Sequence, residues 1–118
     1  MTEKDALIFV EHILDSMKNI EDFTKGVPKE SFMKNKEKQS AVIRQIEVIG
    51  EASKNLSDEF RSKYPQVSWK EIIGARDKII HHYFGVDLEI VWEIITINLP
   101  VLKKQMQEIR KDLEETEK

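Results

Sequence analysis

The chain has 118 residues and no cysteine, which excludes disulfides and thiolate metal sites. Nineteen basic and 22 acidic residues give a formal net charge of −3, so the chain lacks the basic balance of proteins that grip long nucleic acid nonspecifically. Any nucleic-acid ligand would therefore need a local cationic groove. The length fits one domain over residues 1–118. No apolar run approaches the ~20 residues of a membrane helix, and the polar start does not resemble a signal peptide, so we expect no membrane association and a cytoplasmic location.

The first half of the chain carries the apolar periodicity of helices. A first helix is predicted from about Thr2 to Phe23, because apolar residues recur there at spacings of three and four. Residues 24–34, with Gly26 and Pro28, are typical of a connector with one helical turn. A second helix is predicted to end near Leu56, and a short helix over residues 57–64. The predicted buried face of the second helix is Val42, Ile46, Ile49, Ser53 and Leu56.

A third helix is predicted from Ser68 to Gly85. Ser68 and Glu71 have the spacing of a capping box, in which each side chain accepts a hydrogen bond from the other residue's amide. Gly85 is a natural C-terminal stop because glycine tolerates the left-handed conformation. Asp87 is then the expected N-cap of a fourth helix.

The fourth helix has two apolar stripes in its first half. The longer stripe keeps its phase across Pro100, so we expect a kink there rather than a break. A second stripe suits a second neighbour, which is either the rest of the bundle or another subunit; we favour another subunit. Together the elements predict an all-α fold, an antiparallel bundle of four to five helices. The second stripe is Ile90, Ile94, Ile97 and Val101.

The third predicted helix carries a charge in an unexpected place. Arg76 falls on the same helical face as Trp69 and Tyr83, where an arginine must be paired, snorkelled or facing a wet cleft. Asp77 and His81 are four residues apart, so their side chains could meet on one helical face. Arg76 and His81 are about 140° apart around a regular helix, so they converge only through unwinding at the helix end or across a dimer.

The segment Gly74-Ala75-Arg76-Asp77 through His81-His82-Tyr83-Phe84-Gly85-Val86-Asp87 resembles the core of HepT-like proteins in the HEPN superfamily. The extended pattern Arg-x4-His-x-Tyr-Phe-Gly-Val-Asp is specific, and the likeness covers essentially the whole chain. It implies a homodimeric ribonuclease that cuts RNA without a metal or other cofactor. Arg76 and His81 match its two catalytic positions, and Asp77 matches the polar residue that follows the arginine.

The resemblance also implies regulation. Tyr83 matches the tyrosine that, in the HepT subgroup, accepts AMP from a partner nucleotidyltransferase antitoxin. An AMP group there would add bulk and negative charge beside Arg76 and His81, so RNA would be repelled, as by phosphorylation. The cognate partner would be a minimal nucleotidyltransferase, and the pair a toxin–antitoxin system.

Each of these residues also has a plainer interpretation. Arg76 could be a structural ion-pair partner of Glu47 or Glu51, His81 a helix cap, and Tyr83 a core or interface residue. A metal site built on Asp77 and His81 lacks an evident third ligand. We assign no role to His12 and expect His82 to be solvated. The alternative function is a non-catalytic HEPN binding partner of a small nucleotidyltransferase.

Overall fold

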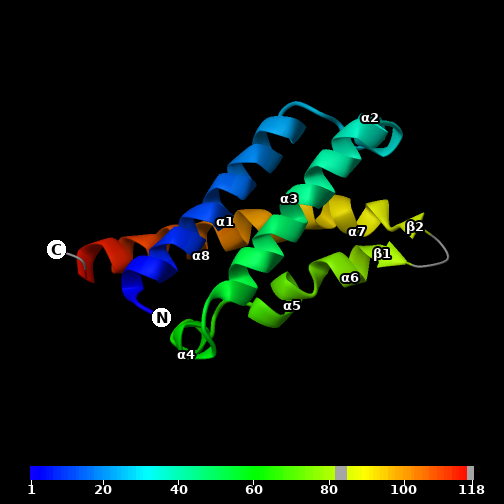
Figure 1. Ribbon diagram of the computed structural model, residues 1–118. Coiled ribbons are helices and arrows are strands. Elements are labelled where there is room, and N and C mark those ends of the chain that lie inside the picture. The colour runs from blue at the N-terminus through cyan, green and yellow to red at the C-terminus, as the bar shows by residue number, and fades with distance from the viewer. Residues whose placement is uncertain (82–84, 117–118) are drawn as a thin grey trace.

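The computed structural model describes residues 1–81 and 85–116, and these form an elongated bundle of 47 × 31 × 20 Å (Figure 1). Successive long segments run antiparallel, and both chain ends lie at one end of the bundle, with the short β pairing at the other (Figure 1). The fold is all-α, as predicted. The elements follow in this order: α1 (Glu3–Thr24), α2 (Lys29–Lys34), α3 (Lys36–Asn55), α4 (Asp58–Ser62), α5 (Trp69–Ile73), α6 (Ala75–Ile79), β1 (Ile80–His81), β2 (Gly85–Val86), α7 (Leu88–Glu93), the π-helical η1 (Ile94–Asn98) and α8 (Leu99–Thr116).

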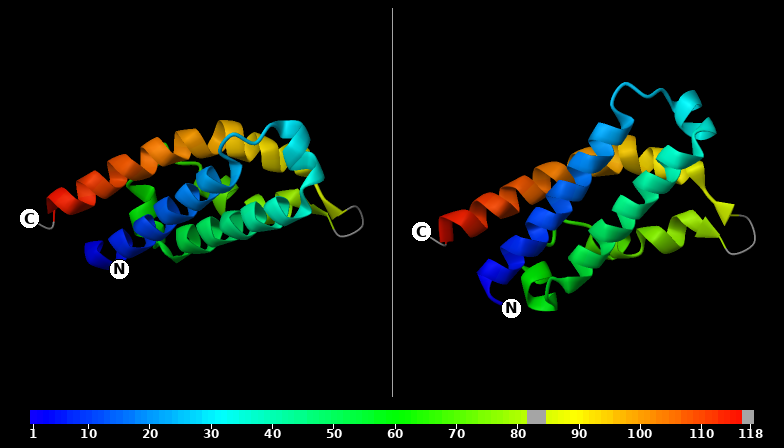
Figure 2. Two further views of the ribbon diagram at one scale, coloured as in Figure 1. Left: turned by 90° about the horizontal axis from the view of Figure 1, so that it is seen from above. Right: turned by 45° about the horizontal axis from the view of Figure 1, so that its top comes forward.

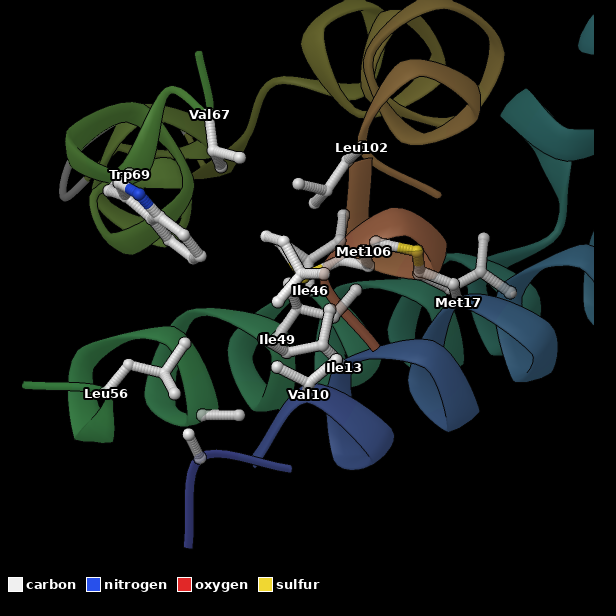
Figure 3. Close-up of a cluster of buried hydrophobic side chains, with 14 of the residues drawn as sticks. Val10, Ile13, Met17, Ile46, Ile49, Leu56, Val67, Trp69, Leu102 and Met106 are labelled. Carbon is white, nitrogen blue, oxygen red and sulfur yellow. The ribbon is translucent and has the colours of Figure 1, made fainter. Parts of the chain in front are cut away.

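The core lies where α1, α3 and α8 meet, with Trp69 and Val67 closing one side (Figure 3). The apolar stripes predicted for the first two helices are buried, including Ser53 of α3. Burying each large aliphatic side chain contributes about 1.5–3 kcal/mol, so these stripes account for the packing of the long helices. No helix in the described ranges is long and apolar enough to cross a membrane.

The contact between α3 and α5 depends on a glycine. A Cβ atom built on Gly50 would lie 3.3 Å from the carbonyl oxygen of Ile72 and 3.5 Å from that of Ile73. The backbone of α5 therefore passes directly over the Gly50 backbone. This close approach brings α5 and the following α6 alongside α3 (Figure 1).

The predicted third helix is wrong in length and continuity. The helical path is interrupted at Gly74 and ends at Ile79, six residues before Gly85. The chain then turns extended because Ile80 pairs with Val86 in an antiparallel register. The amide of Asp87 also donates to the carbonyl of Ile79 at 2.7 Å. Gly85 has the expected left-handed conformation (φ +77°), but it does so in this β pairing and not as a helix stop.

The predicted capping box at Ser68 is also wrong. Ser68 makes no side-chain cap hydrogen bond and has ψ 66°, whereas the working serine cap Ser57 has ψ 157°. The burial of Trp69 decides the geometry instead, since its indole Nε1 donates to the carbonyls of Arg61 and Tyr64, both at 3.1 Å. Fixing this ring takes precedence over a cap hydrogen bond, which is typically worth ~1 kcal/mol.

The predicted fourth helix, which comprises α7, η1 and α8, begins at the predicted cap but does not have the simple proline kink that was predicted. Asp87 caps α7 by accepting a hydrogen bond from the amide of Ile90 at 3.1 Å. Instead of a simple kink at Pro100, the helix widens into the π-helical η1 just before it. Pro100 has no N–H and its ring crowds the carbonyl four residues back, and a π segment relieves that clash. Figure 2 shows α7, η1 and α8 as one continuous, gently curved rod.

Candidate active site

Arg76 lies on α6, the short helix that ends beside the β pairing (Figure 1). Its side chain is 55% exposed and lies within ion-pair distance of Glu47 and Asp77, so of the three situations expected for this arginine, pairing is the one observed. The break at Gly74 separates α6 from the phase of α5 and lets Arg76 turn away from the core. Arg76 instead faces solvent with carboxylates on two sides.

The first carboxylate belongs to Glu47 of α3. Its Oε1 lies 3.6 Å from Nε of Arg76, and its Oε2 lies 3.7 Å from NH1 of Arg44 on the same helix. Of the two partners predicted for Arg76, Glu47 or Glu51, the structure therefore selects Glu47. Sequence analysis did not single out Arg44, although its spacing of three residues before Glu47 is a signal for a pair on one helical face.

The second carboxylate belongs to Asp77, whose Oδ1 lies 3.9 Å from NH1 of Arg76. The Asp77 side chain is 89% exposed, and both contacts of the guanidinium exceed hydrogen-bond length. Exposed pairs of this kind are worth about 0–1 kcal/mol. These two carboxylates therefore hold the guanidinium only weakly.

His81 lies two residues beyond the end of α6, in β1, where its backbone pairs with Gly85. Asp77 and His81 do not share one helical face as predicted, because helical spacing stops at Ile79; a contact between their side chains stays a prediction. Because the chain leaves the helix after Ile79, the 140° separation expected of Arg76 and His81 on a continuous helix does not apply. The His81 side chain, like the whole of His82 and Tyr83, lies outside the described residues.

A groove of about 640 Å³ is lined by residues of α5 and α6 on one side and of η1 and α8 on the other, a feature that sequence analysis missed. Ala75 and Lys78 line one wall, and the opposite wall comes from η1 and α8. Ile97 and Val101, from the predicted second stripe, stand at this groove with 60% and 57% of their surface exposed. Two large apolar side chains so open to water, beside an apolar groove, are typical of an interaction surface.

The remaining titratable positions show no sign of a second site in the described part of the chain. His12 lies exposed on α1 with its ring edge against Phe9, and nothing there suggests a role. Within residues 1–81 and 85–116, no group of three or more metal-ligating side chains is gathered at one place.

Tyr64 is half-buried beside Asp112; burial raises the pKa of its hydroxyl above the ordinary 10.0, and the Asp112 carboxylate raises it further.

Comparison with known proteins identifies the family of this chain. The sequence model of the family described as "Ribonuclease HepT-like" matches residues 13–109, a range that includes Arg76, Asp77 and His81. The chain belongs to the HepT-like ribonuclease family.

Similar curated proteins extend over nearly the whole chain. "Putative RNase MJ0127" of Methanocaldococcus jannaschii is 50% identical over 97% of this chain and 94% of its own length. "Putative RNase MJ0125" of the same organism is 47% identical over 98% of this chain and 99% of its own. "Probable ribonuclease HepT" of Thermococcus cleftensis is 41% identical over 87% and 94%. No solved structure matches the chain significantly.

Proposed function

We propose that this protein is a metal-independent RNA endonuclease in which Arg76 and His81 act on the scissile phosphodiester and Asp77 assists. One observation carries the proposal. The Arg76 guanidinium stands half-exposed and loosely paired on the short helix α6, five residues before His81, in a chain of the HepT-like ribonuclease family.

The residue types suit the chemistry of RNA cleavage. The ribose 2′-hydroxyl attacks the adjacent phosphorus, the 5′-oxygen leaves, and a 2′,3′-cyclic phosphate remains. The attacking hydroxyl must lose a proton, the leaving oxygen must gain one, and the phosphorane carries extra negative charge. A histidine that titrates near neutrality can perform either proton transfer, worth typically ~10²–10⁴-fold. The planar fork of arginine matches the phosphate oxygens.

A homodimer would supply two copies of each group. The groove beside α6 and the exposed pair Ile97 and Val101 lie on one face, so a twofold axis could seat each copy's pair against the other copy's groove. Because Ala75 and Lys78 line that groove, the helix carrying Arg76 would border the contact. One copy could then provide the general base and the other the general acid.

The dimer has its own test. Wild type should sediment as a dimer at micromolar concentration, and Ile97→Asp should be monomeric. Ile8→Asp is the matched control, since Ile8 is a similarly exposed aliphatic on α1. A monomeric wild type, or a dimer untouched by Ile97→Asp, contradicts this interface.

The toxin–antitoxin role completes the proposal. It rests on the family and on the Tyr83 position within the Arg-x4-His-x-Tyr motif. AMP transferred to Tyr83 by a minimal nucleotidyltransferase would silence cleavage. Intact-mass measurement after co-expression with such an enzyme tests this; no adduct, or an adduct on another residue, contradicts it.

A non-catalytic binding role is favoured by one observation, the two carboxylates beside Arg76, which a structural arginine would also have. Cleavage assays separate the two functions. Labelled RNA is incubated in EDTA with wild type, Arg76→Ala, His81→Ala and the control Arg110→Ala, whose arginine lies on α8 beside Glu114. We expect a loss of at least ~10²-fold in the first two variants only. Cleavage that stops in EDTA overturns the metal-free mechanism, and full cleavage by both site variants overturns the site.

A further inference from the structure

The Glu47 carboxylate lies between two guanidinium groups. One of its oxygens faces Nε of Arg76 at 3.6 Å, and the other faces NH1 of Arg44 at 3.7 Å. Its side chain is only 28% exposed, far less than that of Arg44 or Arg76. The carboxylate is therefore the most buried member of this trio.

The packing of α3 on α5 places the Glu47 carboxylate close to α6. Gly50 lies one turn further along α3 and lets the backbone of α5 pass at van der Waals distance. The face of α3 that carries Glu47 is thereby brought against α6, and Glu47 reaches Arg76 across that contact. A carboxylate in this position repels an anionic phosphate. Its presence beside Arg76 is therefore explained only if it also acts on the arginine.

We propose that Glu47 is a positioning residue for Arg76, an inference that rests on the proposed ribonuclease function. By attracting Nε, Glu47 turns the opposite edge of the guanidinium, with its two terminal nitrogens, toward the phosphate. That edge is the one able to form two parallel hydrogen bonds to phosphate oxygens. Arg44, on the other oxygen of Glu47, offsets the negative charge that RNA would otherwise meet.

If Glu47 served only to stabilise the fold, its loss would lower the free energy of unfolding. Both ion pairs are longer than hydrogen bonds and involve exposed arginines, so they contribute little to folding stability. Orientation of a catalytic group, in contrast, affects rate strongly, since a displacement of about 1 Å can cost ~10²-fold. Loss of Glu47 should thus lower activity without lowering stability.

The test compares Glu47→Gln and Glu47→Asp with the control Glu51→Gln, one turn further along α3 and exposed. Glu47→Gln should lower kcat for RNA cleavage about 10- to 100-fold with KM changed less than about twofold. Glu47→Asp should recover part of the loss, and thermal midpoints should stay unchanged in all three. In an Arg76→Lys background, which lacks Nε, Glu47→Gln should cause no further loss. Wild-type kcat in Glu47→Gln, or an equal loss in the Arg76→Lys background, overturns the inference while the proposed function stands.

A second measurement does not depend on activity. The NMR signal of the Arg76 Nε–H group should shift, and its exchange with water should accelerate, in Glu47→Gln but not in Glu51→Gln. If the wild type fails to cleave RNA, the proposed function fails, and with it the catalytic meaning of Glu47. An unchanged Arg76 signal in Glu47→Gln overturns the positioning itself.

Discussion

Replacing Gly50 with valine tests the contact that aligns the site. Helix propensity alone favours valine over glycine by about 0.4 kcal/mol, so an uncrowded position would be stabilised. At Gly50, however, the added Cβ would already lie 3.3 Å from a backbone carbonyl of α5, and valine adds two further carbons. Overpacking of this kind costs typically ~1–3 kcal/mol. We therefore expect Gly50→Val to lower the free energy of unfolding, opposite in sign to the propensity effect.

Urea unfolding followed by circular dichroism measures the change. With a slope of ~2 kcal/mol/M for a chain of this size, the midpoint should fall by about 0.5–1.5 M. Gly50→Ala should lie near wild type, because its propensity gain of about 1 kcal/mol offsets the tighter contact. Ser40→Val, at an exposed position of the same helix, should change stability by less than about 0.5 kcal/mol. A Gly50→Val protein as stable as wild type would show that α5 does not rest on α3 in this way.

Three further predictions concern separate features. The raised pKa of Tyr64 means that the folded state favours its neutral form, so its contribution to stability is full below pH 10 and is lost as the pH rises through the folded pKa. In Tyr83→Phe, where Tyr64 is the remaining tyrosine, absorbance at 295 nm should titrate above pH 10.0, and a midpoint at or below that value contradicts the burial. Asp87→Ala should lower the free energy of unfolding by about 1 kcal/mol through loss of the α7 cap, with Asp87→Asn largely retaining it, both read by urea midpoints. Arg44→Gln should raise KM for RNA about 3- to 10-fold at low salt and leave kcat nearly unchanged, because it removes a charge that offsets Glu47; an effect confined to kcat would refute this.

Much of the fold could be predicted because its signals are local. The stripes of α1 and α3 follow a spacing of three and four, and the side chains that share a face are buried together. The Asp87 cap needs only its own helix to form, and it forms. The family could also be identified from one continuous segment, since the Arg-x4-His-x-Tyr spacing survives whatever the backbone does between its members.

The path from Gly74 to Gly85 could not be predicted from neighbouring residues. Helical propensity continues through Ile79 and Ile80, and Gly85 looks like a C-terminal stop. The chain leaves the helix early because Ile80 pairs with Val86 and the Asp87 amide reaches the Ile79 carbonyl. These partners are six and eight residues apart, outside the reach of a helical pattern.

The same holds for the surroundings of Arg76. Sequence analysis placed it on an apolar face and could name Glu47 and Glu51 only as alternatives. The break at Gly74 and the packing of α5 on Gly50 turn Arg76 outward and bring it to Glu47.

The order of residues alone thus determined the long helices α1 and α3, the cap at Asp87 and the membership of a ribonuclease family, because these depend on interactions within a few positions of the chain. Tertiary structure alone decided that Arg76 meets solvent and Glu47, that α6 ends before His81, and that Ile97 and Val101 flank a groove. Each of these results depends on which backbone segments pack together, and no local pattern of side chains specifies that.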